Sequence, residues 1–89
     1  MEKPPCFPGR YWCDSHGCTY IVGNPRAGRC DVHTTRQSGD VIRTRYLIRW
    51  DAAESSWRFG KHYVMRVISD GCIRWESSTR KPYLWQQLA

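Results

Sequence analysis

The chain lacks any long apolar run, and this absence limits its relation to membranes. No stretch approaches the roughly 18 apolar residues that a membrane-spanning helix requires. No lysine-rich amphipathic segment predicts a helix anchored at a membrane surface. An apolar leader is also missing after Met1-Glu2-Lys3, which disfavours secretion. We therefore expect a cytoplasmic protein without a membrane partner.

Lysine is scarce beside arginine, with 3 lysines against 11 arginines. Together they outnumber the 8 acidic residues and give the chain a formal net charge of +6. A basic protein attracts polyanions because binding releases their counterions. Arginine in particular holds phosphate or carboxylate through two parallel hydrogen bonds. The composition therefore favours nucleic acid or an acidic protein surface as the partner.

The chain is short, but its composition is that of a folded protein. Hydrophobic residues make up 40% of the 89 residues and aromatic residues 13%, which is enough for a core. A chain of this length buries proportionally less surface than a larger one, so a structural metal would add needed stability. We expect one compact domain over residues 1–89.

Four residues in the first half of the chain have the spacing of a small zinc site. Cys13 and Cys18 form a Cys-x4-Cys pair, and Cys30 and His33 form a Cys-x2-His pair after a gap of 11 residues. Zinc(II) prefers four thiolate or imidazole ligands, and two close pairs supply them with little loss of chain entropy. Glycine and proline between the pairs favour the turns that let both face one ion. We predict a bound Zn2+ within residues 6–36.

Other residues compete for the four ligand positions. Cys6 could fold back over the site, whereas His16, between the first two cysteines, is expected to point outward. A disulfide framework is the competing interpretation, but the odd count of five cysteines and the histidines among them disfavour it. Cys72 lies far along the chain and is expected to be a small buried thiol. Both Cys6 and His16 are near enough in the sequence to stand as alternative ligands, and Cys6 is the stronger of the two.

The same residues carry a family resemblance. Segments 13–18 (CDSHGC) and 28–33 (GRCDVH) resemble the finger at the N-terminus of many bacteriophage HNH endonucleases and small phage proteins, over residues 1–35. In that family the finger is an accessory element thought to help hold nucleic acid, while a separate metal-dependent domain cuts. After His33 only His62 remains, and residues 36–89 contain no asparagine, so the HNH pattern is absent. The resemblance implies a shared binding part without nuclease activity.

The second half of the chain shows the period-two alternation of antiparallel strands. Polar or glycine-containing turns separate the alternating segments, which lie at residues 43–50, 57–68 and 72–76. We expect them to form a three-stranded antiparallel meander within residues 41–77.

The last residues of the chain predict a helix. Pro82 fits the first helical position, and Leu84, Trp85 and Leu88 fall on one stripe. We expect a short helix over residues 80–89 that docks on the sheet. The expected fold class is therefore small α+β or mostly β, with an N-terminal zinc finger, the meander and this helix.

The predicted meander has an aromatic face and a basic face. The aromatic face, which includes Tyr46, Trp57 and Trp75, is expected to form the core, because burying one large side chain stabilises by roughly 1.5–3 kcal/mol. A stacking platform for single-stranded bases is the alternative use of these rings. Trp12 and Trp85 are expected to be the most exposed aromatic side chains.

The basic face gathers arginines, with no acidic residue between them on the first two predicted strands. A face that served solubility alone would mix charges of both signs, so we predict a functional anion-binding face. Arginines near the finger would add phosphate contacts, which set position without reading sequence. The predicted binding residues are Arg29, Arg36, Arg43, Arg45, Arg49, Arg58, Arg66 and Arg74.

These features predict a zinc-stabilised module that binds the phosphates of DNA or RNA, such as a phage-encoded regulator. The alternative is an interaction or inhibitor protein that docks on an acidic surface of a nucleic-acid-processing enzyme, and a truncated HNH-type nuclease is a lesser one. Catalysis is not expected, because four protein ligands leave zinc no open position for an activated water. A nucleophile and base pair of Cys72 and His62 would lack an activating context.

Overall fold

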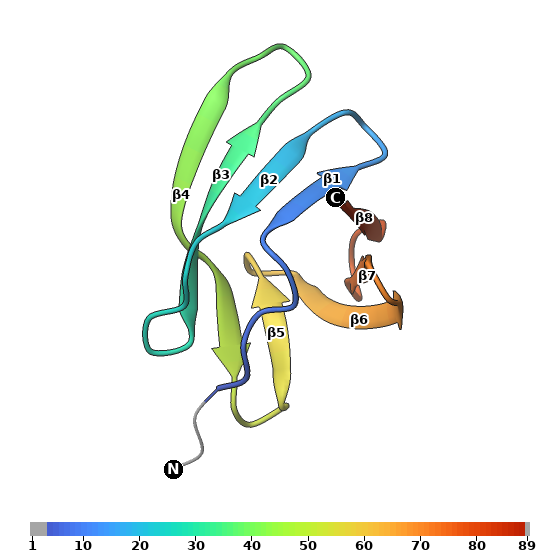
Figure 1. Cartoon of the computed structure of the whole chain (residues 1–89). Helices are drawn as coiled ribbons and strands as arrows, with labels where there is room; N and C mark the ends of the chain where they lie inside the picture. The colour runs from blue at the N-terminus through green and yellow to red at the C-terminus, as the bar shows by residue number, and fades with distance from the viewer. Residues whose placement is uncertain (1–3, 89) are drawn as a thin grey trace.

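The structure, a computed structural model, describes residues 4–88, and all of its regular elements are β-strands. Residues 1–3 of the predicted finger and residue 89 of the predicted helix lie outside the described part. Each strand pairs antiparallel with its neighbour in sequence, and the last pairs with the first, so the sheet closes into a barrel (Figure 1). The strands are β1 (Tyr11–Asp14), β2 (Thr19–Val22), β3 (Arg29–Thr35), β4 (Val41–Asp51), β5 (Ser56–Phe59), β6 (Tyr63–Ser69), β7 (Cys72–Glu76) and β8 (Tyr83–Gln87).

This architecture shows that the expected fold class is wrong. The segment expected to form the zinc finger supplies three barrel strands, β1 to β3, and the segment expected to be a helix contains β8. Residues 57–68, expected to be one strand, form the β5–β6 hairpin, with Gly60 in its turn at φ 59°. The expected meander is therefore part of an eight-stranded sheet. In the part of the chain that the structure describes, no helix is long and apolar enough to cross a membrane.

The strand at the C-terminus follows from alternation and pairing. Tyr83 is half-buried, Leu84 is exposed and Trp85 is buried, which is the period of a strand because neighbouring side chains point to opposite faces. Trp85 pairs with Asp14 of β1 and with Ile73 of β7. These long-range partners outweigh the helical stripe that the local sequence shows.

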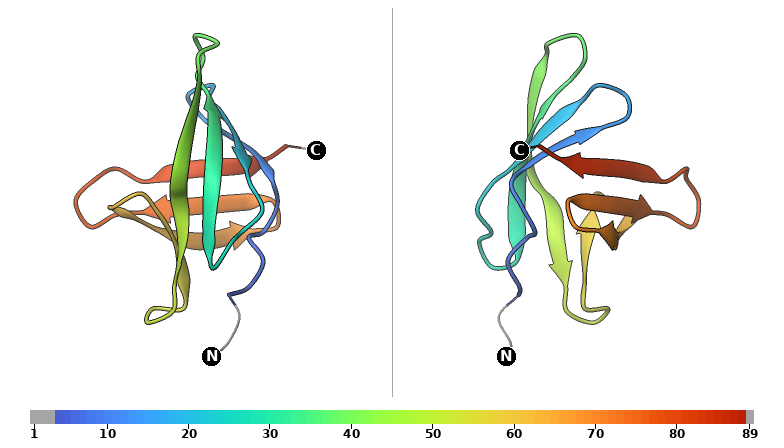
Figure 2. Two further views of the ribbon diagram at one scale, coloured as in Figure 1. Left: turned by 90° about the vertical axis from the view of Figure 1, so that its left-hand side faces the viewer. Right: turned by 45° about the vertical axis from the view of Figure 1, so that its right-hand side comes forward.

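The strand β4 is the longest, with 11 residues, and it joins two parts of the barrel. Its first residues pair with β3, and its last residues pair with both β3 and β5. Between them the register jumps from Val32↔Thr44 to Cys30↔Ile48, so that Asp31 lies opposite the three residues 45–47. The bulge lets β4 bend, and Figure 2 shows β6, β7 and β8 running across the direction of β3 and β4.

Aromatic side chains fill the interior of the barrel. Trp12, Trp75 and Trp85 are at most 2% exposed. Phe7, from the segment before β1, inserts among the tryptophans, and its ring lies edge-on to Trp57 at a centroid distance of 5.4 Å. The prediction that Trp57 and Trp75 form the core is confirmed. The expectation that Trp12 and Trp85 are exposed is wrong, because β1 and β8 close the barrel and turn both rings inward.

Candidate nucleic-acid interface

The bulge in β4 determines which side chains reach the outer surface. Tyr46 adopts φ 53°, in the left-handed region that bulky residues rarely occupy. Its backbone N–H donates a hydrogen bond of 3.1 Å to Oδ1 of Asp31, which fixes the bulge against β3. Arg45 and Tyr46 are both exposed as a result, and the tyrosine lies outside the core in which the sequence placed it.

Arginines surround this exposed ring. The guanidinium carbons of Arg29 and Arg45 lie 5.5 Å and 5.6 Å from the centroid of Tyr46. A hollow of about 400 Å³ opens beside the ring, between the β2–β3 connection and β4. We call it the tyrosine hollow, and its charged, titratable and aromatic lining is Arg26, Arg29, Asp31, His33, Arg43, Arg45 and Tyr46.

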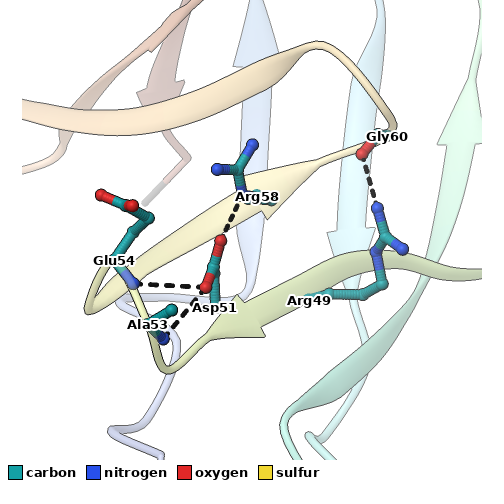
Figure 3. A network of polar contacts seen from close by, with 6 residues as sticks. All are labelled: Arg49, Asp51, Ala53, Glu54, Arg58 and Gly60. Carbon is teal, nitrogen blue, oxygen red and sulfur yellow. Dashed lines mark hydrogen bonds and ion pairs between the residues drawn. The ribbon is translucent and has the colours of Figure 1, made fainter.

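A second hollow of about 370 Å³ lies toward the C-terminal end of β4, and its charged and aromatic lining is Arg29, Arg49, Trp50, Asp51 and Arg58; we call it the tryptophan hollow. Nε of Arg58 donates to Oδ2 of Asp51 at 2.7 Å, and Nη2 of Arg49 donates to the carbonyl oxygen of Gly60 at 2.9 Å (Figure 3). These bonds hold two guanidiniums at the surface of the β4–β5 hairpin.

Arg29 lines both hollows and joins them. It pairs across the sheet with Arg49, which pairs in turn with Arg58. Because neighbouring strands lie roughly 4.8 Å apart, the three arginines form a row on the outside of β3, β4 and β5. The two hollows, together called the paired hollows, are therefore one basic surface.

Two carboxylates lie within this surface, those of Asp31 and Asp51, and both residues lie outside the predicted strand segments 43–50 and 57–68. Asp31 accepts a 2.8 Å hydrogen bond from Arg43, and this guanidinium, with the Tyr46 amide, holds the pKa of Asp31 below its usual value. The Arg58 guanidinium, with the Glu54 amide, lowers the pKa of Asp51 in the same way. Six guanidiniums still face two carboxylates, so the paired hollows remain strongly positive.

The structure brings together five of the eight predicted binding arginines, Arg29, Arg43, Arg45, Arg49 and Arg58. The others lie elsewhere. Arg36 is exposed in the β3–β4 turn. Arg66 and Arg74 face each other across β6 and β7 outside both hollows, and Nε of Arg74 lies 3.6 Å from Oε1 of Glu76.

Arg26, Tyr46 and Trp50 belong to the site but were absent from the predicted set of binding residues. Arg26 lies in the β2–β3 connection, outside any predicted strand. The one feature of the sequence that pointed to it as a binding residue was its positive charge near the predicted finger. Tyr46 was assigned to the aromatic core face by strict alternation, and a bulge leaves no mark on that pattern. Trp50 is half-buried and packs against the core, and it also lines the tryptophan hollow.

The structure does not bring the four predicted zinc ligands together. Cys30 is fully buried inside the barrel, whereas His33, three positions along the same strand, is exposed on the outside. Cys18 packs against the core, and Cys13 lies partly buried on β1. Among residues 4–88, no three His, Cys, Asp or Glu side chains are grouped so that they could hold a metal ion.

The remaining cysteines and His16 do not complete such a group. Cys6 and His16 are exposed, Cys72 begins β7 and is partly buried, and all five cysteines are free thiols. Burial raises the pKa of Cys30 to about 11, so its thiol is protonated at neutral pH. Zinc binding therefore stays a prediction of the cysteine spacing, and elemental analysis of the purified protein for about one zinc per chain tests it.

The paired hollows can bind anions through fixed guanidiniums and can offer an aromatic ring to a flat ligand. Searches against family models, curated proteins and solved structures found no match to this chain.

Proposed function

We propose that the protein binds nucleic acid through the paired hollows, as a binding protein and not as an enzyme. The observation that carries the proposal is the position of Arg29, which joins two arginine-lined hollows into one surface. A single small anion would occupy one hollow. Two adjacent hollows instead suit the evenly repeated phosphates of a polynucleotide, which guanidiniums hold through charge-assisted hydrogen bonds.

The phosphate contacts have a measurable consequence. Each phosphate that is neutralised releases counterions, so the logarithm of the binding constant falls linearly with the logarithm of the salt concentration. The slope steepens by roughly 0.7 per phosphate contact for a single strand and by roughly 0.9 for a duplex. With several guanidiniums in contact, affinity should fall steeply between about 50 mM and about 200 mM salt. We also propose a cytoplasmic location, where free thiols such as those of this chain stay reduced.

Charge reversal at the site tests the proposal. The variant Arg29→Glu/Arg45→Glu should weaken binding to a fluorescent oligonucleotide by at least about tenfold in anisotropy titrations, because it removes two contacts and adds two repulsive charges. The matched control is Arg66→Glu/Arg74→Glu, which changes the net charge equally at two exposed strand positions outside the paired hollows. This control should lose far less affinity.

Two outcomes would contradict the proposal. Equal losses in both variants would mean that net charge, and not this surface, attracts the ligand. No salt-sensitive binding of any oligonucleotide by the unchanged protein would favour the alternative, in which the same arginines dock on an acidic surface of a nucleic-acid-processing enzyme.

A further inference from the structure

We propose that the bound nucleic acid is single-stranded, with one base stacked on Tyr46 in the tyrosine hollow and the adjoining phosphate held by Arg29. This inference rests on the proposed function and specifies its substrate class. It follows from three features of the surface: the exposed ring, the concave shape beside it and the second aromatic side chain beyond Arg29.

The Tyr46 ring is available to a ligand. It is 44% exposed, although tyrosine carries a large apolar surface that a small barrel would otherwise bury. The guanidiniums of Arg29 and Arg45 lie over it at 5.5 Å and 5.6 Å, as exposed cation–π contacts, which are weak. A base on the ring would exchange these contacts for stronger stacking and would free both guanidiniums for phosphates.

The shape of the site favours an extruded nucleotide over a duplex. The tyrosine hollow has a volume of about 400 Å³, within the roughly 300–1,000 Å³ of pockets that take small ligands. A base in a duplex is stacked on both faces and shows only its edges, so it cannot place a face on Tyr46. A base in a single strand can be splayed out and stacked on an aromatic side chain.

The tryptophan hollow adds a second aromatic side chain, Trp50, which is less exposed than Tyr46. Trp50 is partly buried and packs edge-on against Trp57, with ring centroids 5.3 Å apart, so its position is fixed. Arg29 lies between the two hollows because it lines both. Two successive nucleotides can therefore occupy the two hollows, with their common phosphate on Arg29.

The first test compares strands. Anisotropy titrations at one salt concentration would measure Kd for a single strand of roughly ten nucleotides and for a hairpin duplex of similar charge. We expect tighter binding of the single strand. A strand that carries 2-aminopurine reports stacking directly, and its fluorescence should be quenched on binding.

The second test changes the ring and keeps the charge. Tyr46→Leu should weaken single-strand binding by roughly 5- to 100-fold and abolish the quenching, whereas Tyr46→Phe should keep both. Tyr11→Leu is the matched control, because Tyr11 is 47% exposed and lies 5.9 Å from the Arg10 guanidinium but lines neither hollow. The affinity of the Tyr11→Leu variant for the single strand should stay close to that of the unchanged protein.

The outcomes separate this inference from the proposed function. Equal or tighter binding of the duplex, or undiminished binding and quenching with Tyr46→Leu, would overturn the single-strand inference and leave nucleic-acid binding intact. Absence of binding to both ligands would overturn both. If Tyr46→Leu does not fold, the strand comparison and the quenching by the unchanged protein still decide the question.

Discussion

At the scale of single residues, Tyr46 has an unfavourable backbone conformation, which the hydrogen bond from its N–H to Asp31 holds in place. Three described residues other than glycine have positive φ, namely Ala27, Tyr46 and Ser55, and the tyrosine alone is bulky and lies within a strand. Such a conformation costs of order 1–3 kcal/mol and tends to persist at functional sites. At Tyr46 the strain coincides with the hollow where we place the ligand.

Tyr46→Gly should separate stability from binding. Glycine adopts positive φ without a steric penalty, so we expect the free energy of unfolding to rise by about 1 kcal/mol, or about 4–8 °C in Tm for a domain of this size. Nucleic-acid affinity should fall, because the ring is lost. Thermal melts followed by circular dichroism, with anisotropy titrations, measure the two effects.

Ser55→Gly is the control for this prediction. Ser55 has φ 50° in the β4–β5 turn and lines neither hollow, so the substitution should stabilise the protein and leave binding unchanged. A lower Tm for Tyr46→Gly would show instead that the tyrosine side chain stabilises the bulge.

At the scale of elements, β4 shows how far alternation can be trusted. Residues 43–50 were predicted to be a strand, and all of them lie within β4. The face of Tyr46 was nevertheless wrong, because the bulge depends on Asp31 in another strand. Residues 57–68 were predicted to be one strand, but they form two strands with a turn at Gly60. The turn was missed because the buried side chains lie at odd-numbered positions on both sides of it, for example Trp57 and Met65, so the alternation looks unbroken.

The β4–β5 hairpin should lose stability in acid through Asp51. Its carboxylate accepts hydrogen bonds from the amides of Ala53 and Glu54, at 3.1 Å and 3.2 Å, and pairs with Arg58 across the hairpin. The folded pKa of Asp51 lies below its usual 3.8, so the ionised form is the one that folding favours. The ionised Asp51 carboxylate therefore adds to the free energy of unfolding above its usual pKa, and this stabilisation is lost as the pH falls through the lowered pKa.

Asp51→Asn tests this pH dependence. The amide oxygen can still accept the turn hydrogen bonds, but the charge opposite Arg58 is gone. Urea denaturation should show a variant less stable than the unchanged protein at pH 6 and nearly equal to it well below pH 3.8. An equal stability difference at both values would assign the effect to packing and not to ionisation.

At the scale of the whole molecule, stability rests on the tryptophan-filled interior and on the β1–β8 closure. Trp85 belongs to both, since it is buried in the core and pairs with Asp14 of β1. Trp85→Ala should lower the free energy of unfolding by about 3–5 kcal/mol, a large share of the roughly 5–15 kcal/mol of a typical domain. Chemical denaturation measures this loss.

The neighbouring residue provides the comparison for that loss. Leu84 is 40% exposed on the outside of β8, and Leu84→Ala should cost about 1 kcal/mol or less. Similar losses at the two positions would mean that residues 83–87 are not the barrel strand β8.

The amino-acid sequence by itself determined the excess of positive charge, the strand character of residues 43–50 and 72–76, and the glycine-containing turn between residues 68 and 72. These features are local, because charge is additive and alternation and turn chemistry act over a few neighbouring residues. Only the tertiary structure decided that β8 closes on β1, that β4 bulges opposite Asp31 and that Arg29 joins two hollows. Each of these depends on which residues of different strands pair with one another, and the alternation within one segment does not specify its partner.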